Sequence, residues 1–161
     1  MKIAIAGYGV VGRGTHELLL MNRDKIAARA GEEIEVKYVL DPKPLEGTPA
    51  EQLRASGIEE ILADPEVKLL VEAIGGVGPA YEYVKAALES GRSVVTPNKQ
   101  LVAEKGAELL AIAREKNVGF LFEASVGGGI PIIRPISQCL AANDVIEIAG
   151  ILNGTTNYIL S

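Results

Sequence analysis

Three glycines near the start of the chain have the spacing of a phosphate-binding turn. An apolar run over residues 2–6 leads directly into Gly7, Gly9 and Gly12, and a helix-compatible segment follows from Arg13. In this strand–turn–helix setting the first glycine permits the tight turn, the second lets the backbone approach a pyrophosphate, and the third lets the helix pack close to the strand. The pattern therefore predicts a dinucleotide-binding turn with the pyrophosphate at the helix N-terminus. The alternative is a glycine-rich turn that binds nothing.

An acidic side chain ends the next predicted strand. Residues 34–40 alternate between apolar and polar, and Asp41 follows them. An acid at this point accepts hydrogen bonds from the adenosine ribose hydroxyls and favours NAD over NADP, because it repels a 2′-phosphate. Lys43 opposes that preference. Asp41 lies 29 residues after Gly12 rather than the usual ~20, which predicts a long connection; a plain Asp-Pro turn is the alternative.

Two further strand ends carry residues suited to the same site. Gly75 and Gly76 follow a predicted strand at 68–74, and Lys99 follows another at 93–96. Because the carboxyl ends of parallel strands meet at one edge of a sheet, we expect all three residues to face the same crevice. The glycines would let a ribose or nicotinamide approach the backbone, and the lysine would contact cofactor or substrate. A bare turn and a solvated surface lysine are the alternatives.

A second glycine-rich segment has the composition of a cation site. Glu123 is followed by three consecutive glycines at 127–129. These expose main-chain carbonyl oxygens next to a carboxylate, and a ligand set made only of oxygen suits a hard cation rather than zinc. A flexible loop beside an ordinary glutamate is the alternative.

The chain has one histidine and one cysteine, and neither is expected to be catalytic. His16 has no second histidine or cysteine near it, so we expect a solvated residue on the first helix. Cys139 is expected on the apolar face of a helix at 131–141, as inert core, although Pro135 should disturb that helix.

Strands and helices alternate along the chain. We expect helices at 12–30, where Gly31 is a natural stop, and at 80–89 and 101–116, with a fifth strand at 118–123. Such alternation predicts an α/β fold with a doubly wound, mostly parallel sheet of the Rossmann type.

Length and composition limit the classes of protein to consider. The chain has 161 residues, enough for one domain, and a net charge of −5, which argues against a nucleic-acid partner. No apolar run reaches about 18 residues, the length needed to span a membrane. With one cysteine and no leader pattern, a cytoplasmic protein is expected. Because the last apolar residues have no following element to pack on, we expect a dinucleotide-binding domain at 1–152 and the start of a truncated catalytic domain at 153–161.

Four segments together resemble homoserine dehydrogenase. They are the glycine turn at 7–12, Thr-Pro-Asn-Lys at 96–99, the glutamate–glycine segment at 123–130, and a long segment at 150–160. The resemblance covers the whole chain and the N-terminal part of the family's length. Its members reduce aspartate 4-semialdehyde to homoserine with NADH or NADPH, in the route to threonine and methionine.

The resemblance implies roles for particular residues. Lys99 is similar to the family lysine that reaches cofactor and substrate, and Thr155 to a residue at the substrate edge of the nicotinamide pocket. Pyrophosphate and ribose are implied to lie on Gly7, Tyr8, Gly9, Val10, Val11 and Gly12. A monovalent cation, usually sodium, is implied to be held by Glu123 with the carbonyls of Val126, Gly128 and Ile130. Members are commonly homodimers, and their other catalytic groups lie in a later domain, so we expect this chain to bind a dinucleotide with little or no turnover.

Other interpretations stay open at this point. Many members have arginine where this chain has Leu40, and its absence favours NAD. An aspartate-semialdehyde dehydrogenase would need a nucleophilic cysteine in a strand-end loop, and Cys139 is expected within a helix. A non-catalytic dinucleotide-binding or sensor module is the third interpretation.

Overall fold

A parallel sheet forms the centre of the molecule. The computed structural model describes residues 1–150, and within them five strands pair in the order β2-β1-β3-β4-β5, all parallel. The strands are β1 (Lys2–Ala6), β2 (Glu35–Leu40), β3 (Val67–Glu72), β4 (Ser93–Val95) and β5 (Phe120–Leu121). The expected Rossmann-type α/β fold is confirmed.

The strand order places a topological switch point next to β1. From β1 the chain crosses to β2 on one side and then returns to β3 on the other. In open α/β sheets, ligands bind in the crevice beyond the carboxyl ends of the two strands at such a point. The residues expected to bind the dinucleotide follow the carboxyl ends of β1, β2, β3 and β4.

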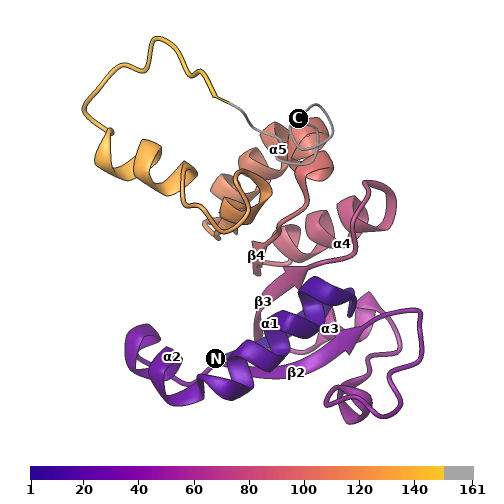
Figure 1. Ribbon diagram of the computed structural model, residues 1–161. Helices are drawn as coiled ribbons and strands as arrows, with labels where there is room; N and C mark the ends of the chain where they lie inside the picture. Colours follow the sequence, from indigo (N-terminus) through magenta and orange to yellow (C-terminus); the bar gives the residue numbers. More distant parts are fainter. Residues whose placement is uncertain (151–161) are drawn as a thin grey trace, which may run out of the picture.

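Five α-helices connect the strands within residues 1–150 (Figure 1). They are α1 (Val10–Met21), α2 (Arg23–Ala30), α3 (Ile58–Ala63), α4 (Gly78–Glu89) and α5 (Lys99–Lys116). Short turns of 3₁₀ helix lie at Glu51–Leu53 and Glu123–Ser125, and a π-helical turn spans Pro135–Cys139. No helix within the described part of the chain is long and apolar enough to cross a bilayer.

The core lies on both faces of the sheet because β1 is buried on both sides. Ala4 and Ala6 face a cluster built with α3, α4 and α5, whereas Ile3 and Ile5 face a second cluster that includes Tyr8 and the segment 45–50. These four residues of β1 are each at most 2% exposed. A strand buried on both faces reads as a continuous apolar run, as residues 3–6 do.

The first expected helix is in fact two helices. The expectation of one helix at 12–30 is wrong: α1 ends at Met21, Asn22 leaves helical geometry with φ −114°, and α2 begins at Arg23. The expected stop is confirmed, because Gly31 caps α2 in the left-handed conformation at φ +78°. The additional helix accounts for the long spacing between Gly12 and Asp41.

Elements late in the chain are shorter than expected. The strand at 118–123 contains two residues, and the expected helix at 131–141 is largely a π-helical turn that begins at Pro135. Cys139 ends that turn and is exposed, so its expected place in the core is wrong. The strand expected at 68–74 ends at Glu72. The segment at 153–161 and Thr155 lie outside the described residues.

Candidate active site at the carboxyl ends of the strands

The glycine turn after β1 lies between the ends of β2 and β3. The N–H of Gly7 donates to the carbonyl of Leu40 at 2.8 Å. Gly7 has φ +93°, and a Cβ at this position would lie 2.5 Å from the carbonyl carbon and oxygen of Ala73. Only glycine fits both the backbone conformation and the contact. The turn is therefore held at the switch point.

Gly12 brings α1 close to the turn while Gly9 leaves its outer side open. A Cβ on Gly12 would lie 1.9 Å from the carbonyl oxygen of Gly7, whereas a Cβ on Gly9 would meet nothing within 4 Å. Gly9 is the N-cap of α1, with no side-chain cap hydrogen bond. The first N–H groups of α1 are thus open to an anion, which is the arrangement expected for pyrophosphate. Val10 and Val11 stand exposed at this helix start.

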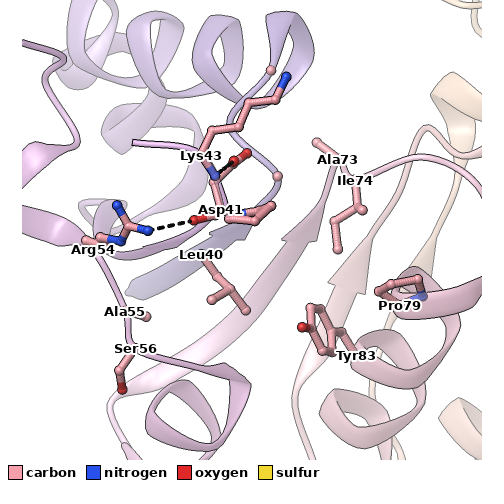
Figure 2. Close-up of a pocket in the computed structure, with 13 residues that line it drawn as sticks. Leu40, Asp41, Lys43, Arg54, Ala55, Ser56, Ala73, Ile74, Pro79 and Tyr83 are labelled. Atoms are coloured by element: carbon pink, nitrogen blue, oxygen red, sulfur yellow. Dashed lines mark hydrogen bonds between the residues drawn. The ribbon is translucent and has the colours of Figure 1, made fainter. Parts of the chain in front are cut away.

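The Asp41 carboxylate connects the end of β2 to the glycine turn. One oxygen accepts the N–H of Tyr8 at 2.5 Å, and the other accepts the N–H of Lys43 at 2.8 Å. Arg54 donates from its guanidinium to the Asp41 carbonyl at 3.4 Å (Figure 2). Because both carboxylate oxygens accept backbone hydrogen bonds, the side chain is fixed in place before any ligand arrives.

A cavity of about 580 Å³ joins these groups. Gly7, Gly9 and Asp41 line it at one end, with the cationic side chains of Lys43 and Arg54 beside them. The opposite wall is formed by Ala73, Ile74, Pro79 and Tyr83 (Figure 2). The volume lies within the usual range for a cofactor or small-ligand site.

Sequence reasoning missed Arg54 in this cavity. The residue belongs to the irregular connection between β2 and α3, and it enters the site because it bridges to Val39 while the N–H of Ala55 donates to the Val39 carbonyl. No sequence pattern pairs residues 39 and 54. The positive charge of Arg54 adds to that of Lys43 near Asp41.

His16 is buried, so its expected solvation is wrong. Its side chain is 3% exposed, and Nδ1 lies 2.8 Å from the hydroxyl oxygen of Tyr8. Burial lowers the pKa of His16 from its ordinary 6.5, against the smaller opposing effect of the Glu17 carboxylate. Because the Tyr8 ring packs edge-on to the imidazole, with centroids 5.9 Å apart, the tyrosine side chain anchors the glycine turn to α1.

The ends of β3 and β4 carry a second group of polar residues. Glu72 is fully buried, and it interacts with the loop containing Gly75 and Gly76 and with the hydroxyl of Thr96. Lys99 is exposed and is the first residue of α5. None of Gly75, Gly76 and Lys99 lines the cavity around Asp41. Sequence reasoning missed Glu72, although an acidic residue within an otherwise apolar strand is a signal that the sequence contains.

The Glu123 carboxylate caps the helical turn that follows its loop. One oxygen accepts the N–H groups of Ile132 at 2.5 Å and Ile133 at 2.9 Å, and the other accepts that of Arg134 at 2.9 Å. Desolvation raises the pKa of Glu123, but these backbone hydrogen bonds outweigh it and leave the pKa below its ordinary value. Within residues 1–150 no three His, Cys, Asp or Glu side chains gather as a metal cluster. A cation here would depend on main-chain carbonyls.

Comparisons with known proteins agree with this geometry. A family model described as homoserine dehydrogenase, NAD binding domain, matches residues 7–123, and one described as homoserine dehydrogenase matches residues 131–161. Homoserine dehydrogenase of Pseudomonas aeruginosa is 46% identical over this whole chain, which covers 37% of that protein. The chain thus spans well under half the length of this relative.

Solved structures give the same result. The crystal structure of a homoserine dehydrogenase from Thiobacillus denitrificans matches the whole chain with a TM-score of 0.92 and 41% identity, and the chain covers 38% of it. A second match is a hyperthermophilic archaeal homoserine dehydrogenase in complex with NADPH, with a TM-score of 0.68 and 28% identity. The match covers 84% of this chain and 48% of the archaeal chain. The chain therefore belongs to the homoserine dehydrogenase family, and its residues 7–123 match the NAD-binding domain of that family.

Proposed function

We propose that this chain binds NAD(H) within an enzyme that interconverts homoserine and aspartate 4-semialdehyde. The observation that carries the proposal is the cavity at the switch point, where the open N-terminus of α1 and the prearranged Asp41 carboxylate line one space. The intact enzyme is proposed to be a cytoplasmic homodimer, as its family resemblance implies.

The dinucleotide is proposed to lie across the strand ends. Its pyrophosphate would meet the N–H groups after Gly9, and its adenosine ribose would meet Asp41. The nicotinamide half would then extend past β3 towards Gly75, Gly76 and Lys99, because β4 lies beyond β3 in the sheet.

NAD is proposed over NADP because, in this binding mode, the 2′-phosphate of NADP would lie next to the Asp41 carboxylate. Leu40 supplies no cation before it, and the carboxylate repels the added negative charge. Lys43 and Arg54 act in the opposite direction, so the preference is a balance between one fixed acid and two exposed cations.

Lys99 is proposed as the catalytic residue of this chain. The bound dinucleotide supplies the hydride, and a nearby ammonium stabilises the negative charge that develops on the aldehyde oxygen. Lys99 forms no ion pair with any residue in the range 1–150, so its charge is available for that role. Thr155 is proposed at the substrate edge of the pocket.

Calorimetric titration with NADH and with NADPH tests the cofactor assignment. We expect tighter binding of NADH, by about tenfold, which corresponds to ~1.4 kcal/mol. Asp41→Asn should reduce that preference, and Arg54→Gln should increase it by weakening NADPH alone. Tighter binding of NADPH by the wild-type chain would overturn the choice of NAD, and binding of neither dinucleotide would overturn the proposed site.

The Glu123 loop is proposed to bind a monovalent cation such as sodium. Its donor set fits a hard cation, because the carbonyls of Val126, Gly128 and Ile130 accept no backbone hydrogen bond among the described residues. Sodium chloride should raise the unfolding temperature more than choline chloride at equal ionic strength, and Glu123→Gln should abolish that difference. An equal response to both salts would contradict the proposal.

A further inference from the structure

A buried carboxylate joins the two loops that follow β3 and β4. Glu72 is 0% exposed at the last position of β3. Its Oε1 accepts the N–H of Ile74 at 2.7 Å and that of Gly75 at 3.2 Å, while its Oε2 accepts the hydroxyl of Thr96 at 2.5 Å. One side chain thus holds the glycine loop of β3 and the first residue after β4.

The connection continues from Thr96 to the start of α5. The Thr96 hydroxyl oxygen accepts the N–H of Asn98 at 3.0 Å. Asn98 then acts in two directions: its Nδ2 donates to the carbonyl of Gly76 at 2.6 Å, and its Oδ1 accepts the N–H of Leu101 at 3.1 Å. The second contact caps α5, whose first residue is Lys99.

A buried carboxyl group at this point requires an explanation beyond packing. An apolar side chain would fill the space without the cost of removing a carboxyl group from water. No Lys, Arg or His among residues 1–150 pairs with Glu72, so its cost is offset only by the three hydrogen bonds that it accepts. Gly75, whose N–H is one of these three donors, has φ +83°, and Gly76, whose carbonyl accepts from Asn98, has φ +68°. The hydrogen bonds from both sides therefore fix the loop in a left-handed backbone conformation that glycine tolerates.

The network lies on one side of the proposed dinucleotide. Asp41 follows β2, which pairs with one side of β1. Glu72 is the last residue of β3, on the other side of β1, and Thr96 follows β4. Under the binding mode proposed above, the network therefore lies beneath the nicotinamide half and away from the adenosine half.

We propose that Glu72 is a positioning residue for the nicotinamide half of the cofactor. Through Thr96 and Asn98 it fixes the Gly75–Gly76 loop and the start of α5 as one surface, and so sets where Lys99 stands. This inference rests on the proposed function, and it adds a residue that neither touches the ligand nor belongs to the glycine turn.

Comparing NADH with ADP-ribose separates positioning from mere folding. ADP-ribose contains the adenosine, both phosphates and the second ribose but lacks the nicotinamide. A variant that loses only the positioning of the nicotinamide surface should keep its affinity for ADP-ribose and lose affinity for NADH. A variant that damages the fold should lose both.

Three substitutions in the full chain interrupt the network at different points. Glu72→Gln turns an accepting oxygen into an N–H donor facing Thr96. Thr96→Val removes the hydroxyl, and Thr96→Ser restores it. Asn98→Asp keeps an oxygen to cap α5 but removes the donor to Gly76. Glu108→Gln is the control, because Glu108 accepts a Tyr81 hydroxyl hydrogen bond on the exposed middle of α5.

We expect the ratio of NADH affinity to ADP-ribose affinity to fall about tenfold in Glu72→Gln, Thr96→Val and Asn98→Asp, since each leaves a buried polar group without its partner. Thr96→Ser and Glu108→Gln should keep the wild-type ratio. The inference would be overturned if all three folded variants lost affinity for NADH and ADP-ribose equally, or if the ratio of the two affinities stayed at its wild-type value.

The wild-type titration distinguishes this inference from the proposed function. A wild-type chain that binds neither ligand overturns the proposed function and the inference with it. A wild-type chain that binds NADH and ADP-ribose equally overturns the inference alone. If Glu72→Gln loses its cooperative unfolding transition, Asn98→Asp decides, because its helix cap is retained.

Discussion

At the scale of single residues, the two glycines of α1 have opposite roles. A Cβ on Gly12 would lie 1.9 Å from a backbone oxygen, whereas a Cβ on Gly14 would meet nothing within 4 Å. We expect Gly12→Ala to destabilise the fold by on the order of 3 kcal/mol through overpacking, and to weaken NADH binding. Gly14→Ala should stabilise it by about 1 kcal/mol, as for other helical glycines. Urea titrations measure both, and equal effects would contradict this view of the turn.

His16 gives the chain a pH response that can be assigned to one group, because it is the only histidine. Its pKa is lowered in the folded state, so the unfolded state binds the proton more readily. This contribution to stability is fully present above about pH 6.5 and is lost as the pH falls below that value. Comparing urea midpoints at about pH 7.5 and about pH 5.5 should show a smaller acid loss in His16→Gln. An identical loss in both proteins would contradict the assignment.

At the scale of elements, α2 lengthens the β1–β2 crossover without taking part in the core. None of its residues is buried, whereas α1 buries Gly12 and His16. The position of Asp41 is set by the pairing of β2 with β1, in which Leu40 lies opposite Ala6. The length of the crossover and the place of the acid are therefore independent.

Replacing Arg23–Ala30 by a short glycine–serine loop tests that independence. We expect the NADH affinity to change by less than about threefold, because Tyr8 still donates to Asp41. The unfolding temperature should fall by a few degrees, since the exposed Arg23–Glu33 ion pair and the helix itself are lost. Loss of NADH binding in a folded variant would show that α2 positions the acid.

At the scale of the whole molecule, the described residues provide binding groups without a partner for proton transfer. Lys99 forms no ion pair with an acid among residues 1–150, and oxidation of homoserine must release its hydroxyl proton to some group. We expect the 161-residue chain to bind NADH and to show no homoserine-dependent NADH formation. The full-length Pseudomonas aeruginosa relative serves as the active control. Turnover by this chain alone would contradict the prediction.

The sequence predicted the parts of this site that depend on neighbours along the chain. A glycine turn and a strand end are local patterns, and they predict Gly7, Gly9, Gly12 and Asp41. In the structure Gly7, Gly9 and Asp41 line the cavity at the switch point, and Gly12 packs against Gly7. It could not predict Arg54, whose place depends on a bridge to Val39.

The burial of polar side chains could not be predicted from the sequence either. The sequence predicts a solvated His16 because it has no histidine or cysteine near it along the chain. In the structure the hydroxyl of Tyr8, across the glycine turn, is its hydrogen-bond partner. No local pattern marks Glu72, because its three donors come from loops after two different strands. Local pattern gives the elements, whereas the polar contacts between loops depend on the assembled sheet.

The central position of β1 has a consequence for how the protein is made. β1 precedes both of its neighbours, since β2 begins at Glu35 and β3 at Val67. At a synthesis rate of about 10 residues per second, the apolar strand waits roughly 6 seconds before its second partner exists. During that time its edges are open to pairing with other chains. The strand that leads into the glycine turn is therefore open to mispairing until β3 has been made.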